Sequence, residues 1–432
     1  MTDHLMTTTL RFLPLALAAL LGACGGGSLP SDDGHLRLVN ATSDFASLDL
    51  FAANSVVVSG VTPLSSSGFA DVKNNNYTLD VHASGGATLV STSTSLGKKA
   101  HQTVVAYSSA GSLNAAVLSD EEGGPSSGNA KVRIFNTASA DAGNLDVYVV
   151  TSACSTLASS GAAAFAANLG GLQSTYTQVS SSTTAYHVCV TAPGNKTDLR
   201  LDIPSLVLSE KRIVTVILVR TAGGFLVNGL VLDQQGALAQ ALTTSARVRV
   251  AASLSPPILV SVDVNGTAVA ASLATPGVGQ YKLVAAGPIT VKVNGTTFAP
   301  VAPLAAAPGA DVTVLLTGTT PTVRLLADNN TVSSSAARPV KLRVVHGLNG
   351  TTGTVTLSVD NGVLADSIAF GSASDYSLLP SSAALATIQA SSGVIVLSRL
   401  TSQTLISGRV YSLFLLGDAS AAPNAGILIA DR

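Results

Sequence analysis

The sequence predicts an all-β protein: a tandem array of four antiparallel Ig-like β-sandwich domains after an N-terminal signal peptide. Two observations predict this fold class. A motif of an apolar residue, Arg and another apolar residue opens four segments, and short apolar strands separated by Asn, Gly and Ser turns fill each segment. The motif returns about every hundred residues, which indicates whole domains because solenoid repeats are much shorter. Its copies lie at residues 36–42, 132–138, 248–254 and 342–348.

The N-terminus carries an export signal. Residues 12–23 form an apolar run behind Arg11, and this run is too short to span a bilayer. It ends in Leu21-Gly22-Ala23-Cys24, which resembles the lipobox of a bacterial lipoprotein. The resemblance implies that residues 1–23 are a lipoprotein signal peptide and that Cys24 is acylated. An ordinary secretion signal with an incidental cysteine is the alternative, and translation starts at Met1 or at Met6.

The residues after Cys24 indicate where the chain resides. Gly25 stands where an Asp would indicate retention at the inner membrane, so by analogy we expect an exported protein anchored by lipid in the outer membrane. Residues 24–34 are rich in Gly, Ser and Asp and form the expected flexible tether. In an oxidising compartment Cys154 and Cys189 can form a disulfide; two small buried thiols are the alternative.

Four repeats follow the tether in order. Each contains a strand after its opening motif, two or more central strands, and a last apolar strand that ends at an Asp. The expected sandwiches are repeat one (35–121), repeat two (131–234), repeat three (247–329) and repeat four (340–432), and the closing residues are Asp120, Asp233, Asp328 and Asp431. Polar or small residues between them indicate linkers. The extra length at 154–171 predicts a loop or short helix over one sandwich edge.

The order of these motifs resembles a known family. An apolar-Arg-apolar-apolar-Asn/His strand, a short Ala/Ser/Thr segment and then Leu-Asp-Val-Tyr is similar to the DUF4397 family of secreted and lipid-anchored bacterial proteins. Residues 36–51 and 132–148 carry the closest likeness, whereas repeat three has Ala252 in place of Asn or His and repeat four has Ser358 in place of Asp. The resemblance implies an antiparallel β-sandwich and supplies no catalytic residue.

A recurrent Asp is the best candidate for a site. Asp49, Asp146 and Asp263 follow the opening strands, and strand alternation turns both these carboxylates and the motif arginines Arg37, Arg133 and Arg249 to the outer face. We expect each Asp to pair with an Arg or to accept backbone N–H groups. A calcium or ligand site is the alternative, but one carboxylate per domain supplies too few oxygens for calcium.

Other motifs do not point to chemistry. His35, His82, His101, His187 and His346 occur singly, and neither Cys154 nor Cys189 has metal-ligand spacing to another Cys or His. The G-x-S-x-G match at 124–128 lies in an expected linker without a following helix. We therefore predict no catalytic, cofactor-binding or metal-ligating residue. The net charge of -1 gives no field for nucleic acid.

The predicted function is that of a non-catalytic cell-envelope lipoprotein, a surface or periplasmic binding or spacer protein of the adhesin-like kind. Its expected partners are the membrane, through the lipid anchor, and a cell-surface protein or glycan. The alternative is a glycan- or small-ligand-binding module whose site lies in sandwich-end loops such as 43–45 and 139–141. An enzyme is the third reading, which a convergent cluster of carboxylate, His and hydroxyl would support.

Overall fold

The computed structural model describes residues 32–109, 112–332, 338–380, 383–421 and 425–432. Strands dominate these residues, which confirms the all-β prediction. The expected signal peptide and Cys24 lie outside the described residues. None of the described helices has the length and apolar character that crossing a membrane requires. Residues 33–432 form one compact unit, described below repeat by repeat.

Repeat one contains two sheets. The first has the order β4-β1-β8-β9, with β5 also paired to β1, and the second has the order β3-β2-β6-β7. The strands of the first sheet are β1 (Gly34–Ala41), β4 (Ser65–Ser66), β5 (Ala70–Val72), β8 (His101–Ser109) and β9 (Ser112–Ser119). Those of the second are β2 (Leu48–Ala52), β3 (Ser55–Val61), β6 (Asn75–Ala83) and β7 (Thr88–Leu96).

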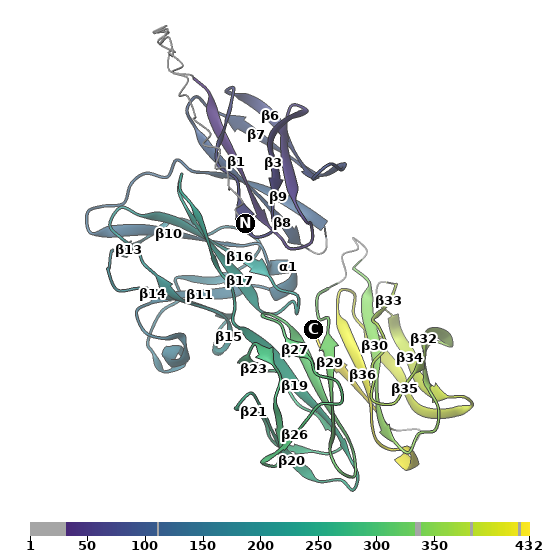
Figure 1. The fold of residues 1–432 in the computed structure, drawn as a ribbon. Coiled ribbons are helices and arrows are strands. Elements are labelled where there is room, and N and C mark those ends of the chain that lie inside the picture. Colours follow the sequence, from purple (N-terminus) through teal and green to yellow (C-terminus); the bar gives the residue numbers. More distant parts are fainter. Residues whose placement is uncertain (1–31, 110–111, 333–337, 381–382, 422–424) are drawn as a thin grey trace, which may run out of the picture. The chain divides into compact units, whose positions relative to one another are not determined.

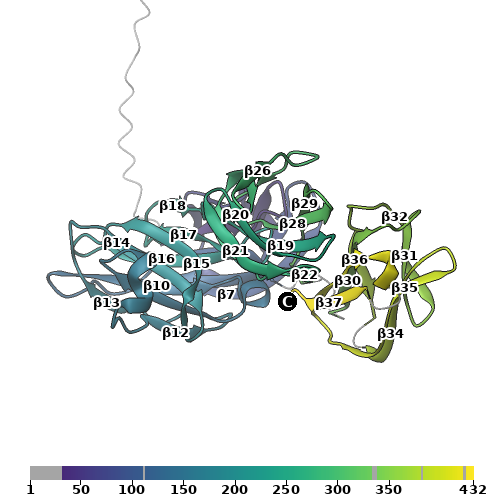
Figure 2. The same ribbon diagram turned by 90° about the horizontal axis from the view of Figure 1, so that it is seen from below.

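Repeat two follows the same plan with sheets β13-β10-β16-β17-β18 and β12-β11-β14-β15. In Figure 2, β16 lies beside β10 and β17, as the pairing requires. The strands of the first sheet are β10 (Asn129–Asn136), β13 (Thr177–Ser180), β16 (Ile213–Arg220), β17 (Val227–Asp233) and β18 (Leu238–Ala241). Those of the second are β11 (Leu145–Val150), β12 (Ala166–Leu169), β14 (Tyr186–Ala192) and β15 (Asn195–Leu206).

Two short helices interrupt repeat two. They are α1 (Ser139–Ala142) and the 3₁₀-helix η1 (Cys154–Ser159). The predicted insertion therefore contains a short helix, but η1 packs on the outer face of a sheet through Cys154 and Leu157, while β12 pairs with the edge of β11. The expected linker 234–246 also differs from prediction, because residues 238–241 form β18 and extend the sheet beyond β17.

Repeats three and four complete the series. In repeat three the sheets are β22-β19-β28-β29, with β23 also on β19, and β21-β20-β25-β26, and a small β24-β27 pair accompanies them. In repeat four they are β33-β30-β36-β37 and β32-β31-β34-β35, and Figure 1 shows β30 beside β36. The strands of repeat three are β19 (Ser245–Leu254), β20 (Leu259–Val264), β21 (Thr267–Ala274), β22 (Gly277–Val278), β23 (Lys282–Ala285), β24 (Gly287–Pro288), β25 (Val291–Val293), β26 (Thr296–Phe298), β27 (Ala305–Ala306), β28 (Asp311–Gly318) and β29 (Thr322–Asp328). Those of repeat four are β30 (Val340–Asn349), β31 (Val355–Val359), β32 (Gly362–Ile368), β33 (Ser377–Leu379), β34 (Ala383–Ser392), β35 (Ile395–Leu405), β36 (Val410–Asp418) and β37 (Gly426–Ala430), and a 3₁₀ turn, η2 (Ala419–Ala421), follows β36.

One ladder in every repeat is parallel, a detail that the expectation of antiparallel sandwiches did not contain. The opening strand runs parallel to the long neighbouring strand that forms late in the same repeat. The pairs are β1 with β8, β10 with β16, β19 with β28 and β30 with β36. The reason is the path of the chain. After the opening strand the chain forms two strands of the other sheet, returns briefly as a short antiparallel edge strand beside the opening strand, and crosses again for the other two strands of the second sheet. It then re-enters the first sheet on the other side of the opening strand and in the same direction.

Strand alternation builds a separate core between the two sheets of each repeat. In repeat one, Leu36 and Leu38 of β1 meet Leu48 and Leu50 of β2, all fully buried. Equivalent apolar clusters lie in the other three repeats. The next residues along the opening strands point the other way, and so the motif arginines do face away from their own cores, as predicted.

These outer faces are nevertheless buried, because neighbouring repeats pack on each other there. Val39 and Val105 of repeat one share an apolar cluster with Ile217 and Leu230 of repeat two. Repeats three and four form a similar cluster through residues on both sides: Ala251, Leu315, Val345, Phe414 and Leu416. The outer face that carries the arginines is therefore an interface between repeats.

Candidate binding sites

The most regular polar feature is a buried cluster around each motif arginine. The guanidinium donates a hydrogen bond to a hydroxyl on the adjacent parallel strand and stacks on an aromatic ring about 4.5 Å away. The four sets are Arg37, Thr103 and Phe69; Arg133, Thr215 and Tyr176; Arg249, Thr313 and Tyr281; and Arg343, Ser412 and Tyr376. Since strand register puts Arg and hydroxyl side by side, the opening motif fixes this contact locally.

In repeats three and four, the motif arginine of each repeat binds the closing Asp of the other repeat, an arrangement called the acid exchange below. Arg249 of repeat three donates through Nη1 to Asp431, the closing residue of repeat four. Arg343 of repeat four donates through Nη2 to Asp328, the closing residue of repeat three. Burial opposes ionisation of Asp328, but the two nearby guanidinium groups outweigh it and hold the pKa of that carboxyl below its ordinary value. The exchange ties the two repeats together.

Repeats one and two are joined differently. Arg37 donates to its own closing residue, Asp120, at 3.0 Å, and also to the backbone carbonyls of Asp233 and Gly236 in repeat two. Burial outweighs the attraction of Arg37 and raises the pKa of Asp120. The Asp233 carboxylate binds Arg212 instead of a motif arginine. Arg37 therefore reaches repeat two through two backbone oxygens, and the apolar cluster and the Arg220–Asp44 pair add to the contact between these repeats.

The aromatic rings and the acid exchange are functional features that the sequence reasoning missed. The closing Asp residues were noticed only as boundaries. The recurrence of an Asp with each recurrent Arg was a signal that could have paired them. An aromatic residue also follows the Arg after 32 or 33 residues in repeats one, three and four, and after 43 in the longer repeat two. The motif arginines and their hydroxyl partners are buried and the rings are partly buried, so most polar groups of these clusters already have partners within the protein.

The recurrent Asp residues of the second strands do not pair with the motif arginines in the described part of the chain, so the first of the two expected arrangements does not occur. Asp49 accepts hydrogen bonds from the Gly60 amide and the Ser84 hydroxyl. Asp146 accepts from the amides of Asn168 and Gly194 at 2.7 and 2.8 Å. Asp49 and Asp146 adopt the second expected arrangement, in which the carboxylate accepts hydrogen bonds from backbone N–H groups. The described residues give Asp263 no such bond.

The remaining singled-out residues lie at several places, and two pairs of them meet: His35 stacks on His101 at 4.3 Å between ring centroids, and His187 lies beside Cys154. His35, His101 and His187 each bond a carboxylate, from Asp71, Glu121 and Asp202 respectively. Ser126 of the G-x-S-x-G match bonds Gln178. His82 stacks on Phe51, and His346 is fully buried against Phe370. Cys154 and Cys189 are joined by a disulfide with a Cα–Cα distance of 5.5 Å.

The two loops proposed as a ligand site do come together. Asp44 and Phe45 of one loop and Asp141 of the other line a pocket of about 440 Å³. Arg220 bonds Asp44 and lies 3.9 Å from Asp141. Burial lowers the pKa of Lys341, on the same wall, to about 8, and repulsion by Arg343 adds to the effect. The pocket therefore offers two cations, two acids and one aromatic ring.

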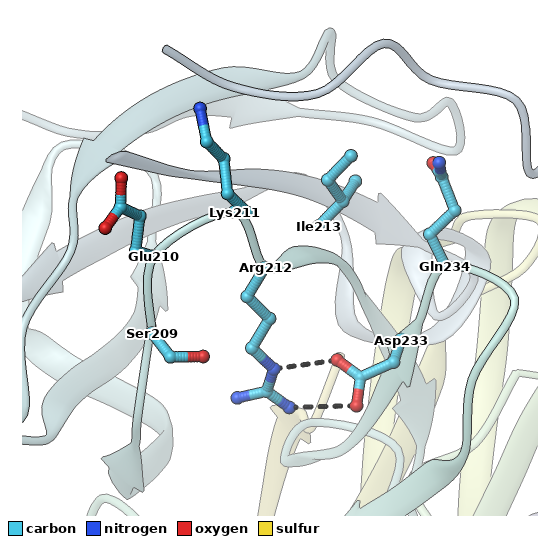
Figure 3. Close-up of a pocket in the computed structure, with 7 residues that line it drawn as sticks. All are labelled: Ser209, Glu210, Lys211, Arg212, Ile213, Asp233 and Gln234. Atoms are coloured by element: carbon cyan, nitrogen blue, oxygen red, sulfur yellow. Dashed lines mark hydrogen bonds and ion pairs between the residues drawn. The ribbon is translucent and has the colours of Figure 1, made fainter. Parts of the chain in front are cut away.

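A more open hollow of about 530 Å³ lies at the turn before β16, and Figure 3 shows its lining. Its central pair is Arg212 and Asp233, joined by two hydrogen bonds. Glu210 accepts from Ser127 and the Gly128 amide, and Lys211 donates to the Pro125 carbonyl. These contacts hold the segment between repeats one and two, so the charged groups of this hollow already have partners.

A third pocket, of about 470 Å³, combines aromatic and charged groups. The guanidinium carbon of Arg247 lies 3.9 Å from the centre of the Phe225 ring, and that of Arg200 lies 4.9 Å from it. Tyr281 also lines the pocket. Both arginines are engaged by carboxylates, Arg247 by Asp311 and Arg200 by Asp198. Such a surface can stack on the flat face of a ligand while its polar rim donates hydrogen bonds.

Part of the chain is similar to a known family. Residues 34–148 match the family model described as Domain of unknown function (DUF4397). The match spans β1 to β9 and continues through β10 and α1 into β11. No curated protein matches the chain. The DUF4397 segment includes Arg37, Thr103, Asp120 and the recurrent Asp49, so the arginine cluster and the capped carboxylate both occur inside it.

Proposed function

We propose that the chain is a non-catalytic lipoprotein of the bacterial cell envelope in which four DUF4397-like sandwiches act as a spacer and binding protein. The observation that carries this proposal is the exchange of buried acids between repeats three and four, Arg249 with Asp431 and Arg343 with Asp328. A single residue removed from such a pair leaves an uncompensated buried charge. The two repeats are therefore expected to move as one body.

Rigidity is what a spacer needs. Flexible joints would let consecutive domains fold back, whereas joints closed by apolar contacts and paired charges transmit position along the chain. Both kinds of contact are present: apolar clusters join repeats one and two and repeats three and four, and arginines cross both joints.

The proposed lipid anchor and the proposed location in the outer membrane are inferred from the sequence. The lipobox ending at Cys24 supports acylation, and Gly25 supports the outer membrane as destination. The disulfide between Cys154 and Cys189 is consistent with an exported protein, because disulfides persist in oxidising compartments. The proposed partner at this end is the membrane itself.

Membrane fractionation of a Cys24→Ser variant tests the anchor. We expect loss of acyl labelling and release of the protein into the soluble envelope fraction. A Cys154→Ser/Cys189→Ser variant is the matched control, because it removes the other two cysteines and keeps the lipobox; it is expected to stay with the membrane. Membrane retention of Cys24→Ser would remove the lipoprotein proposal.

Scanning calorimetry tests the spacer. If repeats three and four form one body, they unfold in a single cooperative transition, and Arg249→Met splits or broadens that transition. Independent transitions for repeats three and four in the unmodified protein would contradict a rigid joint.

A second candidate function is a binding module for a glycan or small ligand, favoured by the pocket that contains Asp44, Phe45 and Asp141. Phe45 supplies a ring for stacking on a sugar, and Arg220 and Lys341 supply donors. A glycan array probed with the soluble chain tests it. Saturable binding that Phe45→Ala weakens, and that Phe225→Ala in the third pocket leaves unchanged, would favour this candidate.

A further inference from the structure

A cluster of sulfur, nitrogen and oxygen donors lies on the outer face of repeat two. Val188 and Val190 of β14 point into the core, so His187 and Cys189 share the opposite face. Asp202 of β15 is directly opposite Cys189 in the antiparallel register. Cys154 reaches the same place from η1, in the insertion of repeat two.

The donor atoms of this cluster are close enough to share one ion. Ligand atoms of Cys154, His187 and Asp202 all lie within 4.8 Å of one another, and Cys189 Sγ is bonded to Cys154 Sγ. His187 Nδ1 is 2.9 Å from Asp202 Oδ1. Two cysteines, a histidine and a carboxylate are a ligand set that zinc accepts in tetrahedral coordination. In the disulfide form the two sulfurs are bonded to each other and carry no thiolate.

We propose that reduction of the Cys154–Cys189 disulfide turns this cluster into a site for a thiophilic divalent cation such as Zn²⁺, with Cys154, Cys189, His187 and Asp202 as ligands. A dithiol reductant supplies two electrons and two protons, the S–S bond breaks, and the reductant becomes a disulfide. The cation then displaces the two thiol protons and binds both thiolates. Oxidation reverses the sequence, so the disulfide closes the site.

The surroundings suit this role. Tyr148 and Leu157 form an apolar wall around the two buried sulfurs, which limits water and strengthens binding to a charged ion. The side chains of His187 and Asp202 are 20% and 34% exposed, so they give a cation a route from solvent. Among the described residues of the other repeats there is no cysteine, and the sandwich itself does not require this cluster.

The insertion is held by more than the disulfide, so reduction need not release Cys154. Lys196 donates through Nζ to the carbonyls of Ser160 and Ala162, at 3.1 and 2.7 Å. Leu157 is fully buried, and the Phe165 amide donates to the Val147 carbonyl at 2.7 Å. Cys154 is thus expected to stay near its ligand partners when the sulfurs separate.

The test is a Cd²⁺ titration of the full chain in a Cys24→Ser background, which leaves Cys154 and Cys189 as its two thiols. After reduction with a phosphine we expect about one Cd²⁺ per chain, seen as a cadmium–thiolate absorption band, and no band in the oxidised chain. Cys189→Ser should weaken the band and lower the affinity, because one thiolate remains, and Cys154→Ser/Cys189→Ser should abolish the band. His187→Ala should keep it but weaken affinity about tenfold or more.

Matched variants and a folding measurement keep this test decisive. His82→Ala, at a histidine on β6 of repeat one that is distant in sequence from this cluster and pairs in register with Asp49, should leave Cd²⁺ affinity unchanged. The site proposal is overturned if the reduced chain gives no band, if the Cys154→Ser/Cys189→Ser variant binds Cd²⁺ equally well, or if reduction abolishes the β-sheet circular dichroism and Cd²⁺ does not restore it.

Discussion

Arg249 and Asp431 form a buried ion pair across two repeats, although 182 residues separate them in the sequence. Arg249 is 1% exposed and Asp431 is 9% exposed. Asp431 also accepts a hydrogen bond from Ser412, the hydroxyl beside the other motif arginine. A charge at this depth is stable only when it is paired and hydrogen-bonded. The joint between repeats three and four is consequently specific to these side chains.

Replacing Arg249 tests that joint. Arg249→Met keeps much of the side-chain volume but leaves the Asp431 carboxylate with only the Ser412 hydroxyl, so we expect a loss of about 3–5 kcal/mol in the free energy of unfolding. Urea denaturation measures it. The control is Arg212→Met, which breaks a partly exposed pair with Asp233 and should cost less than about 1 kcal/mol.

A double variant completes the cycle. Arg249→Met/Asp431→Leu removes both charges, so it should be less destabilised than the sum of the two single variants. Purely additive effects would show that the two side chains do not interact and would contradict the exchange.

The repeat pattern was readable from sequence because alternation and turn residues act locally. The hydrogen-bond partners of the recurrent Asp residues could not be read from the sequence. Arg37 and Asp49 both face outward, but β1 and β2 belong to different sheets, and the outer faces of a sandwich lie on opposite sides. Alternation gives the face of a strand but not the sheet to which the strand belongs, so the sequence alone could not decide between the two arrangements expected for Asp49.

The donor cluster of repeat two shows the same limit. His187 and Cys189 are two residues apart and share a face by alternation alone. Asp202 joins them only through the β14–β15 register, and Cys154 only through the path of an insertion. Spacing rules for metal ligands examine short sequence distances, so they did not find a set assembled from three separate segments.

Asp146 is expected to contribute to stability through the backbone. Asp146→Ala leaves the amides of Asn168 and Gly194 without their acceptor, which should cost about 2–3 kcal/mol in urea unfolding. Asp263→Ala is the control, since the described residues show no hydrogen bond to that carboxylate, and it should change stability by less than about 0.5 kcal/mol. Equal effects at the two positions would refute the capping role.

The disulfide should stabilise repeat two by restricting the unfolded chain. Cys154 and Cys189 are 35 residues apart, so Cys154→Ala/Cys189→Ala is expected to lower the free energy of unfolding by about 2–4 kcal/mol. Denaturation in the Cys24→Ser background measures this. Addition of a phosphine should then destabilise the cysteine-containing chain and leave the variant unchanged; a response of the variant to the phosphine would assign the effect elsewhere.

His346 is expected to make stability depend on pH. Its side chain is fully buried, neither ring nitrogen has a hydrogen-bond partner among the described residues, and burial lowers its pKa to about 4. Between about pH 4 and the ordinary histidine pKa of about 6.5, the unfolded chain binds a proton that the folded chain does not. The contribution of neutral His346 is thus fully present above about pH 6.5 and falls as the pH drops toward 4.

The expected size of the effect is about 3 kcal/mol over that interval, from the difference between a pKa of about 4 in the folded chain and about 6.5 in the unfolded chain. Since other groups also titrate there, the measurement is the difference between the unmodified chain and His346→Leu, followed by urea unfolding from pH 4 to 7. The free energy of unfolding of the unmodified chain, relative to that of His346→Leu, should fall as the pH drops toward 4. His101→Gln, at a partly exposed histidine paired with Glu121, is the control. A difference for His346→Leu that stays constant with pH would show that His346 is protonated equally in the folded and unfolded chains.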